Sequence, residues 1–266
     1  MARASEFLTC IVLIVIVITP SIGLPYILPP TQIIEFMTGK FVNITTLNII
    51  QHTAVKDLSQ EKETVFGEIV YLKSPYFYRS DMVGQPGKRL VIHNSTRTLR
   101  ITNGAITYDG ESLDLLYRFL LLAQKPKRLL EGLQLIGVDV EMVSLTRFEG
   151  RIAYLIGEKE GGSPRLLVDK DLFLPLLLEY GNARYHFSDY RRIMQQTWYP
   201  HKIVYLSKGA AIEEYSIKEI TVNPPVDASL FDIAAIKAQF GVSGPDLDTM
   251  EPEIPSREDE LPHTTE

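Results

Sequence analysis

The chain has 266 residues, of which 45% are hydrophobic and 23% are charged, the proportions of a globular protein. Its formal net charge of -6 gives no basic footprint of the kind that nucleic-acid binding requires, so we expect no nucleic-acid partner. The only cysteine, Cys10, lies in an apolar N-terminal run, so the rest of the chain has no thiol for a disulfide, a thiolate metal site or a nucleophile.

The first 23 residues are typical of an export signal. A predominantly apolar run from Phe7 to Ile18 is followed by the small residues Ser21 and Gly23, at the positions that a signal peptidase reads. The run is shorter than the roughly 20 residues that span a bilayer. We therefore expect residues 1–23 to be a cleaved signal peptide and the protein to be periplasmic. The alternative is an uncleaved leader that anchors the chain to the inner membrane.

The segment after the leader predicts first a helix and then a series of strands. Residues 29–41 predict a helix, because Ile33, Ile34, Met37 and Phe41 recur at a spacing of three to four residues. The following segments are rich in β-branched and aromatic residues and are separated by a proline, glycine turns and an Asn-Gly pair, so they predict strands. These segments are 44–55, 64–73, 76–82, 89–93, 98–102 and 105–108.

The hydrophobic period then becomes helical. Residues 114–122 carry five leucines and Phe119, a composition that suits a short buried helix. A second helix is expected to begin at Pro126, because prolines are favoured in the first turn and the apolar residues after it share one face. Both helices are unusually apolar for surface helices.

From residue 142 the pattern is again that of strands, with turns rich in glycine and aspartate between apolar segments. The strand segments are 142–148, 152–157, 165–169, 174–180, 184–189, 201–206 and 212–222. A last short helix is expected at 231–240. The acidic, proline-containing residues 241–266 are expected to form a disordered tail.

Together these elements predict an α+β fold in one domain, residues 24–240. Strands at this spacing favour a large curved sheet, and we expect an incomplete antiparallel β-barrel of about ten or eleven strands. It would have an N-terminal helix, and the two inserted apolar helices would cover its concave face as a lid.

The strand pair at 64–82 carries large apolar groups on both faces. Because side chains alternate along a strand, one face should hold Val70 and Leu72 while Ile69 and Tyr71 point the other way. A surface sheet needs only one apolar face, so the second must be covered or must bind an apolar guest. The side chains expected to line such a lipid-binding cavity are Val70, Leu72, Tyr78, Met82, Leu90, Ile92, Tyr108, Leu116, Phe119 and Leu120. The alternative for each is ordinary core packing.

Catalytic and metal-binding patterns are weak. The five histidines are scattered, with no pair at the spacing of helical metal ligands. Ser163 follows two glycines but lacks the glycine that completes a nucleophile elbow, so its segment reads as a hairpin turn. We therefore expect no catalytic residues, no metal and no cofactor. The alternative is an acid–base pair that only folding assembles.

Several segments resemble, in their order and spacing, the LolA/LolB-type periplasmic lipoprotein carriers. The segments that carry the resemblance are 67–75 with Arg79, 103–110, 154–156, 165–169, 185–190, 198–203, 220–223, Asp227 and 230–231. The similarity covers about residues 29–232. In one respect the chain departs from the family, since Ser74 stands where the carriers that release cargo to an outer-membrane receptor have an arginine before the proline.

The resemblance implies a half-barrel with lid helices around a cavity for acyl chains in the periplasm. It implies non-enzymatic binding and transport of lipid acyl chains, in particular those of lipoproteins, toward the outer membrane. Hiding each CH₂ from water contributes about 0.8 kcal/mol, so an apolar groove suffices. The alternative is a sensor or scaffold module of the same fold that acts through contacts with an envelope membrane protein. In either case we expect a monomer.

Overall fold

The computed structural model describes residues 27–57, 62–84, 87–95, 97–112, 115–195 and 197–240. The expected signal peptide and the expected disordered tail therefore lie outside the described residues. Within the described ranges, no helix has both the length and the apolar character needed to cross a bilayer.

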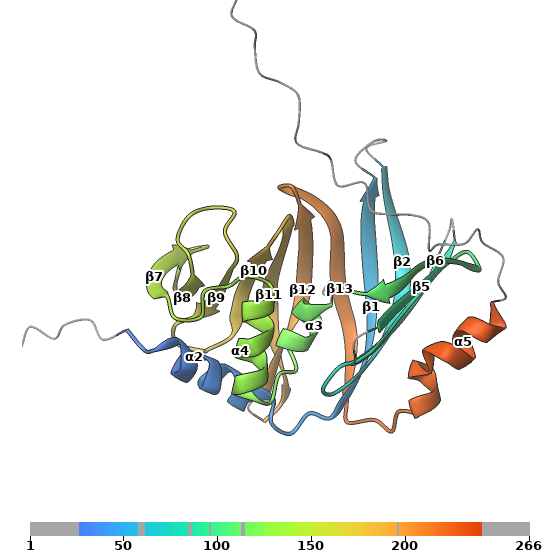
Figure 1. Cartoon of the computed structure of the whole chain (residues 1–266), viewed down its shortest axis with the longest axis horizontal. Coiled ribbons are helices and arrows are strands. Elements are labelled where there is room, and N and C mark those ends of the chain that lie inside the picture. Colours follow the sequence, from blue (N-terminus) through green and yellow to red (C-terminus); the bar gives the residue numbers. More distant parts are fainter. Residues whose placement is uncertain are drawn as a thin grey trace, which may run out of the picture.

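A single antiparallel sheet of 13 strands dominates the molecule and curls into an open half-barrel (Figure 1). The order of its strands is β6-β5-β4-β3-β2-β1-β13-β12-β11-β10-β9-β8-β7. The strands are β1 (Thr46–Asp57), β2 (Lys62–Lys73), β3 (Phe77–Val83), β4 (Lys88–Asn94), β5 (Arg97–Thr102), β6 (Ala105–Glu111), β7 (Val143–Phe148), β8 (Arg151–Gly157), β9 (Arg165–Asp169), β10 (Pro175–Tyr180), β11 (Ala183–Met194), β12 (Thr197–Ser207) and β13 (Ala210–Val222).

The chain builds this sheet as two meanders that meet in the middle. It enters at β1, runs outward strand by strand to β6 at one edge, crosses to β7 at the other edge, and returns to β13, which pairs with β1. The expected incomplete antiparallel barrel is confirmed. The expected number of strands was too low, because each β-like segment of the sequence forms a strand of its own.

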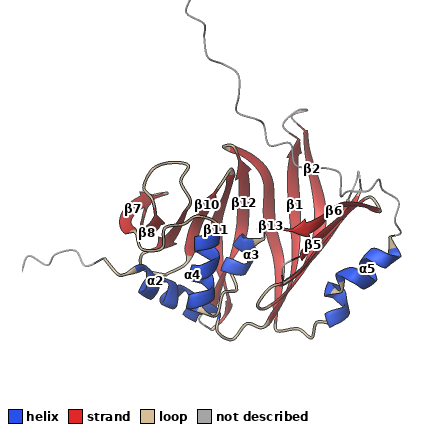
Figure 2. Ribbon diagram, viewed as in Figure 1, coloured by secondary structure: helices blue, strands red, loops and turns tan. Residues whose placement is uncertain are grey.

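The helices lie on both sides of the sheet (Figure 2). The crossover contains α3 (Leu116–Leu120) and α4 (Pro126–Leu135), which lie on the concave side with α2 (Pro30–Thr38) and the 3₁₀ turn η1 (Gly39–Phe41). A second group, η2 (Ala228–Phe231) and α5 (Ile233–Gln239), lies on the convex side.

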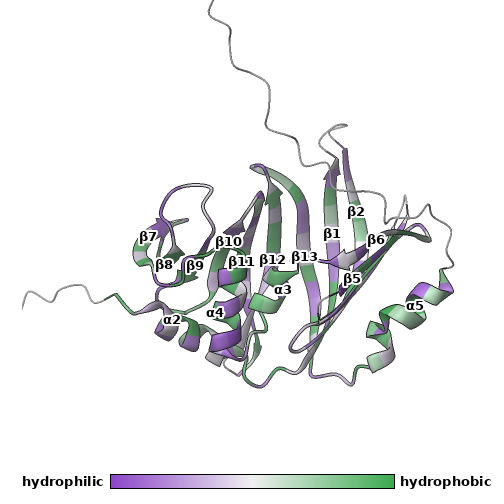
Figure 3. Cartoon of the chain, in the orientation of Figure 1, coloured by the Kyte–Doolittle hydropathy of each residue, from purple (hydrophilic) through white to green (hydrophobic). Residues whose placement is uncertain are grey.

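The two crossover helices differ in character (Figure 3). In α3 every residue from Tyr117 to Leu120 is buried. In α4 only Leu129 and Leu133 are buried, and its other side is polar. The expectation that both helices are unusually apolar for surface helices is therefore wrong for α4, because its charged residues face solvent.

The strand pair β2–β3 alternates as the sequence predicts. Val70, Leu72, Tyr78 and Met82 are buried on the concave face, whereas Ile69 is 39% exposed on the convex face. Residue 78 pairs with His93 and residue 82 with Arg89, so the concave face of β4 holds odd-numbered residues.

The even-numbered residues of β4 accordingly lie on the convex face. There Ile92 packs with Leu99 and Ile101 beneath Ile236 of α5, and Leu90 packs against the same cluster. Close by, the rings of Phe77 on β3 and Phe231 on η2 lie 5.6 Å apart. The second apolar face of this half of the sheet is thus covered by the C-terminal helix.

Candidate functional site

The middle of the concave face is filled by α3. The ring of Tyr117 stacks on Tyr185 of β11, with centroids 4.2 Å apart and planes within 10°. Tyr185 in turn stacks on Tyr205 of β12 at 5.0 Å. Leu120 is fully buried in the same core cluster. The centre of the half-barrel is therefore occupied by the protein's own side chains.

Arg118 of α3 is a buried cation. Its side chain has no exposed area, and its guanidinium carbon lies 5.0 Å from the ring centroid of Tyr117 and 4.9 Å from that of Tyr215. One terminal nitrogen lies 3.5 Å from Oε1 of Gln51. The amide of the same Gln51 donates to Glu68 at 2.6 Å.

The carboxylate of Glu68 is also buried and accepts hydrogen bonds from the hydroxyls of Thr53 and Ser80. Buried charges are costly unless they are paired and hydrogen-bonded. Nη1 of Arg118 has no hydrogen-bond partner among the described residues, but the network supplies partners to both carboxylate oxygens of Glu68. It fixes α3 on the sheet at one specific position. Its presence corrects the expectation of a groove without charges.

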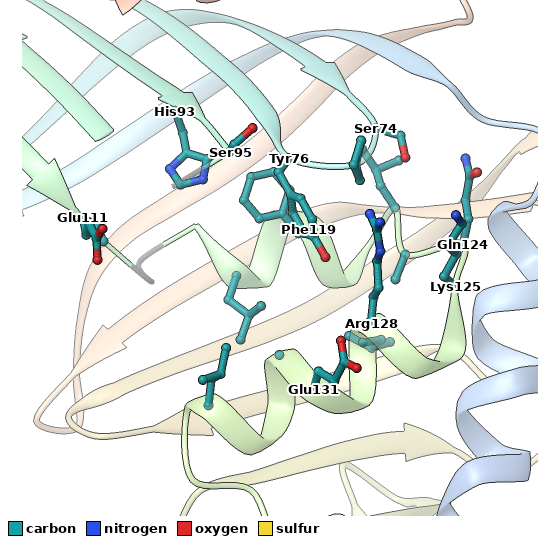
Figure 4. A pocket seen from close by; sticks show the side chains of 18 residues that line it. Ser74, Tyr76, His93, Ser95, Glu111, Phe119, Gln124, Lys125, Arg128 and Glu131 are labelled. Atoms are coloured by element: carbon teal, nitrogen blue, oxygen red, sulfur yellow. The ribbon is translucent and has the colours of Figure 1, made fainter. Parts of the chain in front are cut away.

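A pocket of about 890 Å³ lies beside the side chains of α3 that fill the centre of the half-barrel. It is bounded by α3, α4 and the turn from Ser74 to Tyr76 (Figure 4). Its apolar floor is formed by Tyr76, Leu116, Phe119, Leu122 and Leu129, with the buried His93 against Phe119. Exposed residues and polar residues complete the lining: Ser74, Ser95, Glu111, Ser112, Gln124, Lys125, Arg128, Glu131 and Leu135. The pocket thus has an apolar base and charged or polar side chains around it.

Ring contacts shape the floor of the pocket. Tyr76 meets Phe119 edge to face, with centroids 5.5 Å apart and planes at 87°. The imidazole of His93 lies 5.3 Å from Phe119. On α4, a Cβ at Gly132 would lie 3.4 Å from a methyl of Leu116, so the glycine allows the two helices to approach closely.

His93 is the one titratable group that is both buried and part of the pocket lining among the described residues. Burial lowers the pKa of His93 from 6.5, an effect that a hydrogen bond at the backbone of Ser95 partly offsets. Nδ1 of His93 lies 2.8 Å from the hydroxyl of Thr98, so the ring is held by a threonine. The buried imidazole of His93 is therefore part of the floor of the pocket.

The predicted lining residues divide into three groups. Leu116 and Phe119 line the pocket. Val70, Leu72, Tyr78, Met82 and Leu120 are buried on the concave side without reaching the pocket.

The other three lie elsewhere. Leu90 and Ile92 are on the convex face, because the pairing of β3 with β4 puts Val91 and His93 on the concave side instead. Tyr108 is 36% exposed on the edge strand β6, with its hydroxyl donating to the carbonyl of Glu111. These three positions are corrections to the predicted site.

Sequence reasoning missed Tyr76, His93 and Leu129 as lining residues. Tyr76 follows Pro75, whose position between two strands marks a turn, and turns carry sites more often than strands do. Leu129 lies on the buried face of α4, where periodicity predicted core packing. His93 gave no sequence signal beyond its residue type.

The described residues hold no group of three or more histidine, cysteine, aspartate or glutamate side chains that could bind a metal ion. A smaller hollow of about 190 Å³ on β7–β11 is lined by Phe148, Arg165, Arg184 and His186 among others. Arg165 and Arg184 bind Glu179 there, at 2.8 Å and 2.5 Å, so these two charges are paired within the sheet.

No protein-family model matches the sequence, and no curated protein is similar to it. Solved structures do match. A domain assigned to outer-membrane lipoprotein sorting in Vibrio parahaemolyticus superposes with a TM-score of 0.52 at 10% identity, covering 79% of this chain and 97% of its own. A DUF1329-family protein from Desulfovibrio piger superposes with a TM-score of 0.50 at 12% identity, covering 78% of this chain and 99% of its own.

A LolA-superfamily protein from Nitrosomonas europaea also matches, with a TM-score of 0.48 at 9% identity over 77% of this chain and 98% of its own. The first two likenesses extend over nearly the whole length of both solved structures and include the curled sheet. The chain therefore shares its fold with the lipoprotein-sorting domain and the DUF1329-family protein, and in this chain the fold is an open antiparallel half-barrel with helices on its concave face.

Proposed function

We propose that the protein binds acyl chains of lipids, in particular those of lipoproteins, in the periplasm and carries them toward the outer membrane without catalysing a reaction. The pocket between α3, α4 and the turn at Ser74–Tyr76 is the observation that carries this proposal. Its volume of about 890 Å³ lies within the range of small-molecule sites, roughly 300–1,000 Å³. The fold shared with the lipoprotein-sorting domain supports the same class of ligand.

The packing of the interior limits where an acyl chain can bind. Tyr117, Arg118 and Leu120 close the centre of the concave face, so a chain would enter beside α3 and lie along Phe119 and Leu129. Apolar surface hidden from water provides the binding free energy, at about 0.8 kcal/mol for each CH₂. No catalytic group is needed for such a site.

The test is to express the protein with its own leader, purify it from the envelope and measure co-purified lipid by mass spectrometry. Leu116→Trp should lower the molar ratio of lipid to protein, because the larger side chain fills the pocket. Leu172→Trp is the matched control, since Leu172 is 45% exposed and does not line the pocket. Absence of lipid from the wild-type protein, or equal lipid in Leu116→Trp, would contradict the proposal.

A second candidate is a sensor or scaffold module that contacts an envelope membrane protein. The filled centre of the half-barrel favours it, because α3 leaves less apolar surface free than an empty carrier would. It predicts capture of the same membrane protein by the wild type and by Leu116→Trp after cross-linking in cells. Loss of that capture in the pocket variant would count against it.

A further inference from the structure

We propose that the pocket selects amphiphiles with an anionic head group, which would lie against Lys125 and Arg128 while the tail lies on the apolar floor. This inference rests on the proposed function and specifies the chemistry of its ligand. Both cations line the pocket, and both are exposed.

Neither of these two cations has an ion-pair partner among the residues that the structure describes. Other arginines are paired there, including Arg79 with Asp81 at 2.8 Å and Arg89 with Glu213 at 2.9 Å. In Figure 4 the side chain of Arg128 extends from α4 toward Ser74 and Tyr76. A ligand in the pocket would therefore meet a cation that has no competing carboxylate bound to it.

One acidic residue of the lining, Glu111, favours one orientation of the ligand. Glu111 lies at the far end of the pocket from Lys125 and Arg128 (Figure 4), and Glu131 follows Arg128 by three residues on α4. An anion at the Lys125 end is attracted by two cations and stays distant from Glu111. The rings of Phe119 and Tyr76 lie between the two ends and would contact the tail.

The placement of these cations is unfavourable for the helix itself. Lys125 is the N-cap of α4, Pro126, Lys127 and Arg128 follow, and the first turn has no acidic residue. The amino end of a helix is electrically positive, and a cation there costs about 0.3–1 kcal/mol. A bound anion would offset both the side-chain charges and the helix dipole.

The experiment compares three dodecyl amphiphiles below their micelle concentrations at pH 8: dodecanoate, monododecanoyl glycerol and dodecyltrimethylammonium. The protein is purified from the envelope, freed of lipid and titrated by calorimetry. Dodecanoate should bind about tenfold more tightly than the neutral glyceride, the factor expected for a charge-assisted contact. The cationic compound should bind more weakly than the glyceride. Inorganic phosphate alone should bind weakly or not at all, because it lacks the tail.

Arg128→Gln and Lys125→Gln should each lower the affinity for dodecanoate more than the affinity for the glyceride. Lys127→Gln is the matched control, since it removes a charge from the same turn but does not line the pocket. Equal binding of dodecanoate and glyceride would overturn this inference and leave the proposed function standing. Failure to bind any of the three dodecyl compounds would instead contradict the proposed function.

Discussion

The guanidinium of Arg89 on β4 meets the carboxylate of Glu213 on β13 at 2.9 Å, although β3, β2 and β1 lie between their strands in the sheet. Four inter-strand steps of roughly 4.8 Å make a path of about 19 Å along the sheet. The ion pair therefore crosses the concave side of the half-barrel. Such a short contact between strands four steps apart shows that this part of the sheet is strongly curved. Tyr215 also donates its hydroxyl to Glu213.

Removing one partner of this pair should destabilise the fold. Arg89→Met leaves the carboxylate of Glu213, only 13% exposed, without its cation, and we expect a loss of about 2–4 kcal/mol in the free energy of unfolding. The double variant Arg89→Met with Glu213→Gln should recover part of that loss, because no buried charge is left unpaired. Urea unfolding of the four proteins in the cycle measures the coupling. Strictly additive losses in the free energy of unfolding would show that the Arg89–Glu213 pair does not stabilise the curvature of the sheet.

The buried Arg118 network should behave in the same way but more strongly. Arg118→Met keeps most of the side-chain volume and removes one of the two cations, with Arg89 the other, whose charges act on the buried Glu68. We expect a loss of about 3–5 kcal/mol, largely recovered when Glu68→Gln is added. Urea unfolding provides the measurement. A neutral effect of Arg118→Met alone would mean that Glu68 is held by Gln51, Thr53 and Ser80 without help from the cation.

Leu116 and Phe119 on α3 should respond differently to an added charge. Leu116 is half-buried at the pocket, so Leu116→Asp should abolish lipid binding while the domain stays folded. Phe119 is 9% exposed and packs on Tyr76 and His93, so Phe119→Asp places an unpaired charge in the core and should unfold the domain. Circular dichroism and lipid mass spectrometry of both variants test this contrast. A folded Phe119→Asp protein would indicate that α3 can leave the sheet.

Stability should fall as the pH drops below about 6.5 because of His93. Burial lowers the pKa of His93 in the folded state, so the unfolded chain binds the proton more readily. The stabilisation is fully present above 6.5 and is lost as the pH falls through the folded pKa. His93→Asn should flatten the dependence of the urea midpoint on pH between 7.5 and 5, while a slope from His186, whose pKa burial also lowers, persists.

The control for this titration is Leu172→Asn, because Leu172 is exposed and carries no titratable group. It should leave the pH dependence of the urea midpoint as it is in the wild type. If His93→Asn also leaves that dependence unchanged, the buried imidazole does not contribute to acid sensitivity.

The sequence by itself determined where the strands and helices lie and which residues of β2 and β3 share a face. Local periodicity carries this information, because the alternation of side chains along a strand does not depend on its neighbours. Thus Val70, Leu72, Tyr78 and Met82 are buried together as predicted. The helix of residues 29–41 was likewise readable, since α2 and η1 bury the residues that recur at helical spacing.

Only the tertiary structure decided what faces the hollow beyond β3. Val83 pairs with Lys88 across a loop of four residues, so paired residues on β3 and β4 have opposite parity, and Leu90 and Ile92 turn to the convex face. From its residue type and helical position, Arg118 would be predicted to lie on the surface. Only the tertiary structure brings its side chain to Gln51 and Tyr215. The pocket is likewise assembled from a turn, a strand and two helices that are distant in sequence, which no local pattern encodes.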